Sequence, residues 1–165
     1  MPQESNAGTD NKRGDKPSGD KLIPFISYSK SNITAARDFA EKLKSEGWID
    51  PWFDEEDILP GQVWQDIVTT GVRNSHAVII LLSKVAVSSE GFFHSEIKLA
   101  LDTAAEKPES TIFIIPVRIN DCEVPEMLKK YQYVDYFGGQ EQKERVYSNL
   151  IASLKLRAEN LSIKT

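Results

Sequence analysis

The stretch 76-HAVIILLS-83 contains an unbroken apolar run near the middle of the sequence. Residues 77–82 are apolar without interruption, and a polar residue stands at each end of the run. A short run of this kind is typical of a strand that is buried on both faces of a parallel sheet. We therefore expect residues 76–83 to form a central strand, with other strands of the sheet on both sides of it.

Strand-like and helix-like segments alternate on both sides of this central run. The other expected strands are 22–28, 49–53, 111–119 and 131–137. The expected helices are 32–47, 62–75, 88–107 and 142–160, and residues 120–130 are expected to be irregular, with at most one turn of helix. This alternation predicts an α/β, flavodoxin-like three-layer fold, in which helices cover both faces of a parallel sheet of about five strands. Pro116 cannot donate a hydrogen bond to a neighbouring strand, which favours a place near an edge or a strand end.

Length and composition indicate one ordinary globular domain. The chain has 165 residues, 40% of them hydrophobic, which is enough for a sizeable core. We assign the domain to residues 21–160, between a disordered polar tail at 1–20 and a short tail at 161–165. The net charge of −5 argues against nucleic acid or an anionic membrane as the main partner. No apolar run approaches the ~20 residues of a membrane span, and the first residues lack the apolar core of a signal peptide, so a cytoplasmic location is expected.

Several familiar chemistries find no support in the motifs. The sequence contains neither G-x-x-x-x-G-K-[ST] nor G-x-G-x-x-G, and no serine lies in a G-x-S-x-G elbow. Serine and tyrosine stand after the first strand and Ser83 after the third, where a phosphoacceptor receiver needs acidic residues. The stretch SYSKSNIT has hydroxyls but lacks the glycine of a flavin phosphate loop, so that signal is weak. Cys122 is the single cysteine, and His76 and His94 are the only histidines, so an intrachain disulfide is excluded and no metal site is expected.

One acidic residue stands out in the helix expected at 88–107. Its apolar stripe consists of Phe93, Ile97, Ala100, Leu101 and Ala104. At about 100° per residue, Glu96 falls roughly 85° from the centre of this stripe, with Phe92 beside it one turn earlier. The spacing predicts that Glu96 lies on the shoulder of the helix, between core and water.

The topology gives this glutamate a possible role. In open α/β sheets, ligands bind beyond the carboxyl ends of the strands, where the strand order switches. The residues expected at this rim are Ser27, Tyr28, Ser29 and Lys30 after the first strand, Phe53 and Asp54 after the second, and Ser83 after the third. Glu96 lies on the helix after the third strand, near its start, and so close to the same rim. The alternative is a solvated glutamate on a helix flank, which is the commoner fate of a glutamate.

Four segments in this order carry a family resemblance. They are 22-LIPFISYSK-30, 51-PWFDEEDILPG-61, 71-GVRNSHAVIILLS-83 and 91-GFFHSEIKLAL-101. Together they resemble a TIR (Toll/interleukin-1 receptor) domain, most of all the prokaryotic branch, over roughly residues 21–158. FISY matches the first box of the family. The second box, the BB loop, is matched by Asp54, Glu55, Glu56, Asp57, Ile58, Leu59, Pro60 and Gly61.

The resemblance implies an activity. Many TIR domains cleave NAD, and in those members a glutamate on the third helix is catalytic, commonly after an aromatic in a W-x-x-x-E arrangement. By position the catalytic glutamate is Glu96, and the aromatic is Phe92, a departure from the family's tryptophan. NAD⁺ is then the substrate, no cofactor is needed, and the products are nicotinamide and ADP-ribose or a cyclic isomer of it. Prokaryotic relatives act in antiphage defence.

The expected substrate-binding residues are Ser27, Tyr28, Ser29, Lys30, Trp52, Phe53, Asp54, Ser83 and Phe92. For several of these residues a purely structural role is an open alternative to substrate binding. Tyr28 and Trp52 can pack in the core, Lys30 can be a solvated charge, and Ser83 can cap the next segment. The acidic run Glu55, Glu56 and Asp57 can be a solvated loop face or an electrostatic contact to a neighbouring subunit.

Two rival functions remain beside the glycohydrolase. One is a non-catalytic scaffold, or a host-mimicking effector, that binds other TIR domains through the BB loop. The other is transfer of a sugar between nucleobases, which also uses a glutamate. For the enzyme, the resemblance implies self-association or binding to other TIR domains, with a sensor or activator supplied by another chain or by ligand-driven oligomerisation.

Overall fold

The computed structural model describes residues 20–53, 58–88 and 92–165, apart from the side chains of Phe92 and Phe93. The expected tail at 1–20, with the exception of residue 20, lies outside the described residues. So do Asp54, Glu55, Glu56 and Asp57 of the expected BB loop.

The chain folds as an α/β domain with a four-stranded parallel sheet in the order β1-β2-β3-β4. The strands are β1 Pro24–Ser27, β2 Ala77–Leu82, β3 Ile114–Arg118 and β4 Val134–Asp135. The helices are α1 Ile33–Lys44, α3 Trp64–Asn74, α4 Lys84–Ser88, α5 Phe92–Ala105 and α6 Gln140–Asn160, with single 3₁₀ turns η1 Lys30–Asn32 and η2 Glu126–Leu128. The predicted fold class is confirmed. The short helix α4 is not predicted from the sequence: the helix expected at 88–107 begins at the last residue of α4, and residues 84–87 have no expected element.

The expected strand at 49–53 lies beside β1 but is not a full strand. Two isolated parallel bridges, Leu22 to Ile49 and Phe25 to Trp52, join it to the β1 segment. Backbone bonds run from Asp50 N to Leu22 O and from Trp52 N to Pro24 O. Between them Pro24 has no N–H to donate to Asp50, and this interrupts the ladder. The described sheet therefore has four strands rather than the expected five or so.

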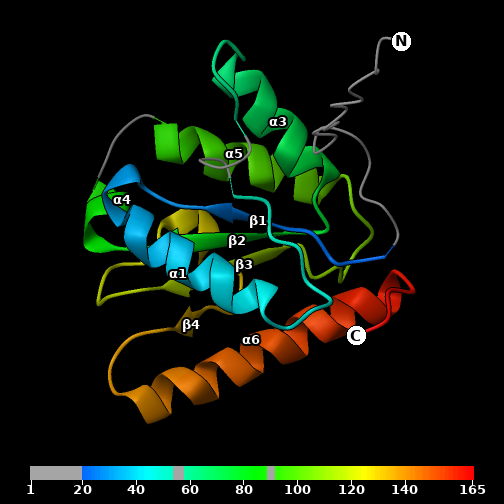
Figure 1. The fold of residues 1–165 in the computed structure, drawn as a ribbon. Helices are drawn as coiled ribbons and strands as arrows, with labels where there is room; N and C mark the ends of the chain where they lie inside the picture. The colour runs from blue at the N-terminus through cyan, green and yellow to red at the C-terminus, as the bar shows by residue number, and fades with distance from the viewer. Residues whose placement is uncertain (1–19, 54–57, 89–91) are drawn as a thin grey trace, which may run out of the picture.

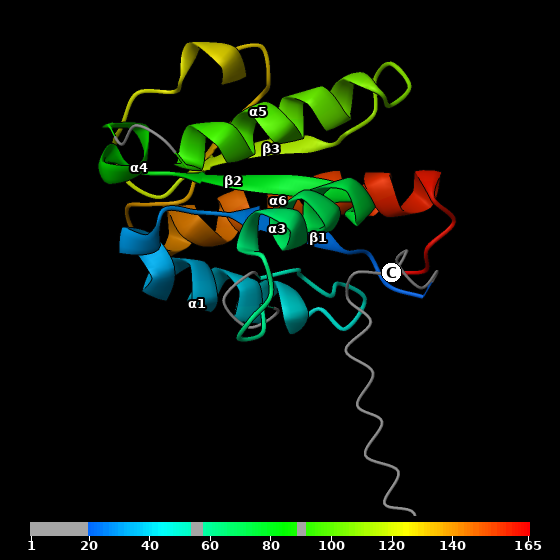
Figure 2. The same ribbon diagram turned by 90° about the horizontal axis from the view of Figure 1, so that it is seen from above.

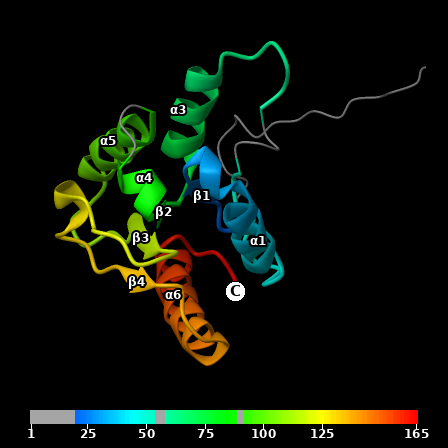
Figure 3. The ribbon, with the colours of Figure 1, turned by 90° about the vertical axis from the view of Figure 1, so that its left-hand side faces the viewer.

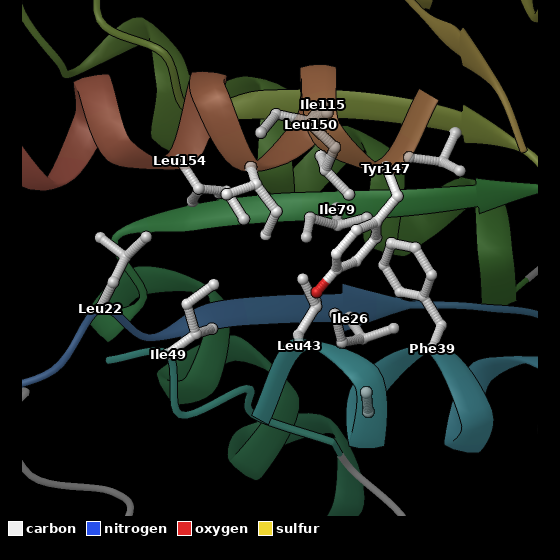
Figure 4. Close-up of a cluster of buried hydrophobic side chains, with 14 of the residues drawn as sticks. Leu22, Ile26, Phe39, Leu43, Ile49, Ile79, Ile115, Tyr147, Leu150 and Leu154 are labelled. Carbon is white, nitrogen blue, oxygen red and sulfur yellow. The ribbon is translucent and has the colours of Figure 1, made fainter. Parts of the chain in front are cut away.

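Successive residues of each strand point to opposite faces of the sheet and pack in two separate hydrophobic cores. The face that carries Ile26, Ile79 and Ile115 packs against α1 and α6, and the opposite face, with Phe25 and Ile80, packs against α3 and α5. Figure 1 shows these two helical layers on either side of the sheet, and Figure 2 looks down on the domain from the side of α3 and α5. In Figure 4, Phe39 and Leu43 of α1 meet Tyr147 and Leu150 of α6 across the first core. The period of two along each strand thus produces the predicted three layers.

The central strand is confirmed as the most buried element. All six residues of β2 are at most 1% exposed, and β2 pairs with β1 on one side and β3 on the other. Pro116 lies inside β3, opposite Ile80, but β4 pairs only with Val117 and Arg118. Pro116 therefore lies in a part of β3 that pairs with β2 but not with β4. On the unpaired side a missing N–H removes no hydrogen bond between strands.

The carboxyl ends of the strands meet along one edge of the sheet. Figure 3 looks onto this edge, with η1 and α4 on it and α5 and α3 above. β1 has the segment 49–53 on one side and β2 on the other. The strand order therefore reverses at β1, and the edge between β1 and β2 is the place where the fold favours a ligand.

Candidate functional site

A buried pair of side chains, Ser27 and Glu96, lies at this edge. The Ser27 hydroxyl donates a hydrogen bond of 2.7 Å to Oε2 of Glu96. Ser27 is 2% exposed and Glu96 is 5% exposed. Ser27 is the last residue of β1, and it follows Phe25 at a spacing of two, so both side chains face the α3 and α5 side of the sheet. The strand pleat therefore directs the hydroxyl toward α5.

The prediction that Glu96 lies on a helix shoulder, partly in water, is wrong. α5 packs on the sheet and also lies alongside α3, as Figures 1 and 3 show. Because the sheet and α3 cover α5 from two sides, its buried face is wider than one apolar stripe. The buried residues on it include Glu96, Ile97, Ala100 and Thr103. Burying a carboxylate is costly unless hydrogen bonds compensate it, and Ser27 supplies one. A carboxylate held in this way is oriented, which suits it to act on a cation placed next to it.

Ser83 makes two further buried contacts at the same edge. Its Oγ donates to Oδ1 of Asn32 at 2.6 Å and accepts from the backbone N–H of Ala86 at 3.0 Å. The second contact is that of an N-cap residue for α4, so the capping alternative for Ser83 is correct. Asn32 was not predicted as a site residue. It lies 51 residues from Ser83 in the chain, and only the pairing of β1 with β2 brings the two together.

Ser29 and Lys30, two further residues predicted to bind substrate, follow β1 at the same edge. Ser29 precedes η1, and its carbonyl accepts from Asn32 N at 2.7 Å. Lys30 is exposed, and so is Lys84 at the start of α4, a residue that the sequence did not single out. The backbone N–H of Lys84 donates to Oδ1 of Asn120 at 2.9 Å, which ties α4 to the segment after β3. Two lysines beside the strand ends give this edge positive charge that suits an anionic ligand.

The aromatic candidates pack among themselves and in the core. Tyr28 stacks on Phe53 with ring centroids 5.1 Å apart. Trp52 is 4% exposed and stacks on Phe25 at 4.8 Å, with Gly71 of α3 packed closely against its ring. These contacts favour the packing alternative for Trp52. The side chain of Phe92 lies outside the described residues.

The described end of the expected BB loop is a tight turn. Gln62 N donates to Leu59 O at 3.1 Å, Pro60 follows Leu59, and Gly61 has φ +88°. These are the features of a type II turn, in which glycine is favoured because its φ is positive. Gln62 also accepts from Leu59 N through Oε1 at 2.8 Å. The turn holds the Leu59 side chain 49% exposed.

Cys122 is a poor alternative for a catalytic residue. Cys122 lies in an open groove of about 530 Å³ beside Lys84 and Glu123, and burial raises the pKa of its thiol, which disfavours the nucleophilic thiolate.

Within the ranges that the structure describes, no cluster of three or more His, Cys, Asp or Glu side chains is arranged to hold a metal. Over the same ranges, no helix is both long enough and apolar enough to cross a membrane.

Comparisons with known proteins agree with the fold and identify a family. The family model described as "TIR domain" matches residues 25–151. The Stimulator of interferon genes protein of Magallana gigas is 27% identical over 104 residues, which are 62% of this chain and 24% of that protein. The chain thus spans about a quarter of the length of this curated relative.

Solved structures show the same fold at low identity. The TIR domain of the Toll-related receptor TRR-2 from Hydra magnipapillata superposes with a TM-score of 0.66 at 20% identity, over 80% of this chain and 97% of that one. A metazoan TIR-STING receptor from C. gigas, in complex with 2′,3′-cGAMP, gives 0.64 at 20% identity, over 85% of this chain and 41% of that one. A prokaryotic SEFIR domain gives 0.60 at 15% identity, over 81% and 99% of the two chains.

Proposed function

The chain belongs to the TIR domain family, and from that premise we propose that it is an NAD⁺ glycohydrolase with Glu96 as its catalytic residue. The observation that carries the proposal is the pair formed by Ser27 and Glu96. It places an oriented carboxylate at the carboxyl edge of the sheet, beside the point where the strand order reverses. The family resemblance assigns the catalytic role to the same residue independently of this geometry.

The chemistry needs one carboxylate. The bond between the ribose C1′ and the nicotinamide nitrogen breaks, and its electron pair goes to the pyridinium, which leaves as neutral nicotinamide without a general acid. The positive charge passes to the ribose as an oxocarbenium-like cation, as in glycoside hydrolysis. Glu96 stabilises that charge, and water adds to C1′ and loses a proton to give ADP-ribose. Attack by the adenine of the same molecule gives a cyclic isomer instead.

The diphosphate and the ribose groups of NAD⁺ lie, in this proposal, against residues that follow the strand ends. Lys30 supplies positive charge for the diphosphate, and the hydroxyls of Tyr28 and Ser29 supply partners for ribose or phosphate oxygens. Lys84 adds a second positive charge at the same edge. Asp54 and Phe92 are proposed contacts on the resemblance alone.

Assembly is part of the proposal. Glu96 is 5% exposed, so a ribose reaches its carboxylate only when the surrounding segments separate. We expect self-association through the BB loop to promote that opening, with Leu59 on its turn as an apolar contact. A sensor or activator chain triggers assembly, and the reaction takes place in the cytoplasm as part of innate immune signalling. The prokaryotic branch and an antiphage role rest on the sequence motifs, since the relatives above include metazoan receptors.

A TIR scaffold without catalysis is the second candidate. It is favoured by the exposed Leu59, which the turn presents as a contact surface, and by the buried state of Glu96. A scaffold needs the turn but not the carboxylate. The two functions therefore differ in which residue they depend on.

Product analysis decides between these functions. The purified chain is incubated with NAD⁺ at rising protein concentration, with and without a crowding agent, and products are resolved by chromatography and mass spectrometry. We expect nicotinamide together with ADP-ribose or a cyclic isomer, at a rate per chain that rises with concentration. Assembled protein that releases no nicotinamide supports the scaffold. Incorporation of labelled nicotinamide into NAD⁺, without net hydrolysis, identifies base exchange.

A further inference from the structure

Asn32 makes an unusual contact for a residue at the start of a helix. It occupies the N-cap position of α1, where an asparagine side chain ordinarily bonds to the first turn of its own helix. Its side chain makes no such cap bond. Instead, Oδ1 of Asn32 accepts the hydroxyl of Ser83 at 2.6 Å, from the turn that follows the neighbouring strand.

The hydrogen of Ser83 is committed to this contact. Ser83 is 0% exposed, and its Oγ accepts from Ala86 N at 3.0 Å. A hydroxyl has one proton and two lone pairs, so the Ala86 contact occupies a lone pair and leaves the proton for Asn32. If the acceptor were lost, a buried hydroxyl would have to find another one, which is costly.

Three hydrogen bonds, together with the short chain segment 27–29, connect Ser83 to Glu96. Asn32 N donates to Ser29 O at 2.7 Å and closes the turn that follows β1. Ser27 lies two residues before Ser29 and donates to Glu96. The Asn32 side chain therefore ties the turn carrying the candidate substrate contacts to the end of β2, on the edge where Ser27 holds the carboxylate.

We propose that Asn32 is a positioning residue for the reaction assigned above to Glu96, acting through its Oδ1 contact with Ser83. The inference rests on the proposed function. Without this contact the turn after β1 is held less firmly against β2, and Ser27 and the strand-end groups lose their fixed geometry relative to Glu96. Small displacements of this kind reduce the chemical step by about 10- to 100-fold.

The acceptor atom makes the inference testable by substitution. Asn32→Asp keeps an oxygen at the same place and can still accept from Ser83, whereas Asn32→Ala removes the acceptor. Asn32→Ser keeps a side chain that is favourable at an N-cap but is one bond too short for Ser83, so it separates the contact from helix stability. Thr34→Ala, an exposed change in the first turn of α1, is the matched control.

The experiment measures nicotinamide release from NAD⁺ by the full chain under assembling conditions, at a temperature below the unfolding transition of every variant. We expect kcat to fall about 10- to 100-fold in Asn32→Ala and Asn32→Ser, and KM to rise, because the same turn carries the proposed substrate contacts. Asn32→Asp and Thr34→Ala should stay close to wild type. If Asn32→Ala does not fold, Asn32→Ser provides the result.

Each other outcome has a distinct meaning. Wild-type kcat in Asn32→Ser overturns this inference and leaves the proposed function intact. Equal losses in Asn32→Asp and Asn32→Ser also overturn it, because the acceptor would then not matter. Assembled wild-type protein that releases no nicotinamide overturns the proposed function, and this inference with it.

Discussion

The hydroxyl of Ser27 donates a 2.7 Å hydrogen bond to the carboxylate of Glu96, across 69 residues of sequence. The contact joins the end of β1 to the second turn of α5, next to the switch in strand order. An oriented carboxylate at this edge is what cleavage of a cationic glycosidic bond requires.

Ser27→Ala should lower catalytic activity while the fold is retained. The substitution removes a donor to a buried carboxylate, and hydrogen bonds to charged groups contribute about 1.5–3 kcal/mol. We expect kcat for nicotinamide release to fall about 10- to 100-fold, with a lower unfolding midpoint. Ser45→Ala, which removes a hydroxyl at the exposed end of α1, serves as the control. An unchanged kcat in Ser27→Ala would show that the Ser27 contact does not support the reaction.

Leu59→Asp should weaken self-association without unfolding the domain. Leu59 is 49% exposed on its turn, so a charge there costs little stability but disfavours an apolar contact between chains. We expect the variant to remain monomeric, by sedimentation, at concentrations where wild type assembles, and its NAD⁺ cleavage to lose its dependence on concentration. Val85→Asp, at a similarly exposed position on α4, is the control. Normal assembly of Leu59→Asp would remove this turn from the interface.

Much of this arrangement could be predicted from sequence, and the failures have physical causes. The place of Glu96, near the start of α5 at the carboxyl edge of the sheet, follows from helical spacing and the strand-end rule, which depend on local pattern and topology alone. Its burial was missed because it results from α3 lying alongside α5, a tertiary contact that periodicity does not contain. The strand-end rule predicts that Ser27, Ser83 and Glu96 lie at the same edge, but it does not say which side chains pair. The contacts of Ser27 with Glu96 and of Asn32 with Ser83 join positions 69 and 51 residues apart, and they depend on the exact packing of the elements. The interrupted hydrogen bonding between β1 and the segment 49–53 could have been predicted, because Pro24, which has no N–H, lies within the expected strand 22–28.

Gly71→Ala should destabilise the domain if Trp52 is a core residue. A Cβ at position 71 would lie 3.0 Å from Cε2 of Trp52 and 3.2 Å from Cε2 of Phe25, closer than ordinary packing allows. Overpacking typically costs about 1–3 kcal/mol, which offsets the gain of about 1 kcal/mol from alanine in a helix. We expect a lower urea midpoint. Gly139→Ala, where a Cβ meets no atom within 4 Å, should change stability little. Stabilisation by Gly71→Ala would indicate that the Trp52 ring is free to move.

Acidification should destabilise the fold partly through His76. Its Nδ1 accepts from Ile23 N at 2.8 Å, and burial, followed by the charges of Arg157 and Lys107, lowers its pKa from 6.5 to about 4. The unfolded chain then binds the proton more readily than the folded one. The stability due to neutral His76 is present above pH 6.5 and is lost as the pH falls toward 4. We expect a loss of roughly 2 kcal/mol over this range, after allowance for partial solvent contact.

Urea unfolding of wild type and His76→Asn at pH 7 and pH 4.5 isolates this effect. Asparagine places Oδ1 where Nδ1 of the histidine accepts from Ile23 but does not titrate, so the variant should lose less stability between the two pH values than wild type. Equal losses in the two proteins would contradict the assigned pKa.

Replacing Glu96 by glutamine keeps the size of the side chain and one oxygen that can accept from Ser27, but it removes the charge. Nicotinamide release from NAD⁺ is measured for wild type, Glu96→Gln and Asp102→Asn, an exposed acidic residue on the same helix, at matched assembly and with matched circular dichroism. Loss of a placed charge in the transition state predicts a fall in kcat of about 10²- to 10³-fold for Glu96→Gln and none for Asp102→Asn. Equal release by wild type and Glu96→Gln would contradict the claim that Glu96 is catalytic.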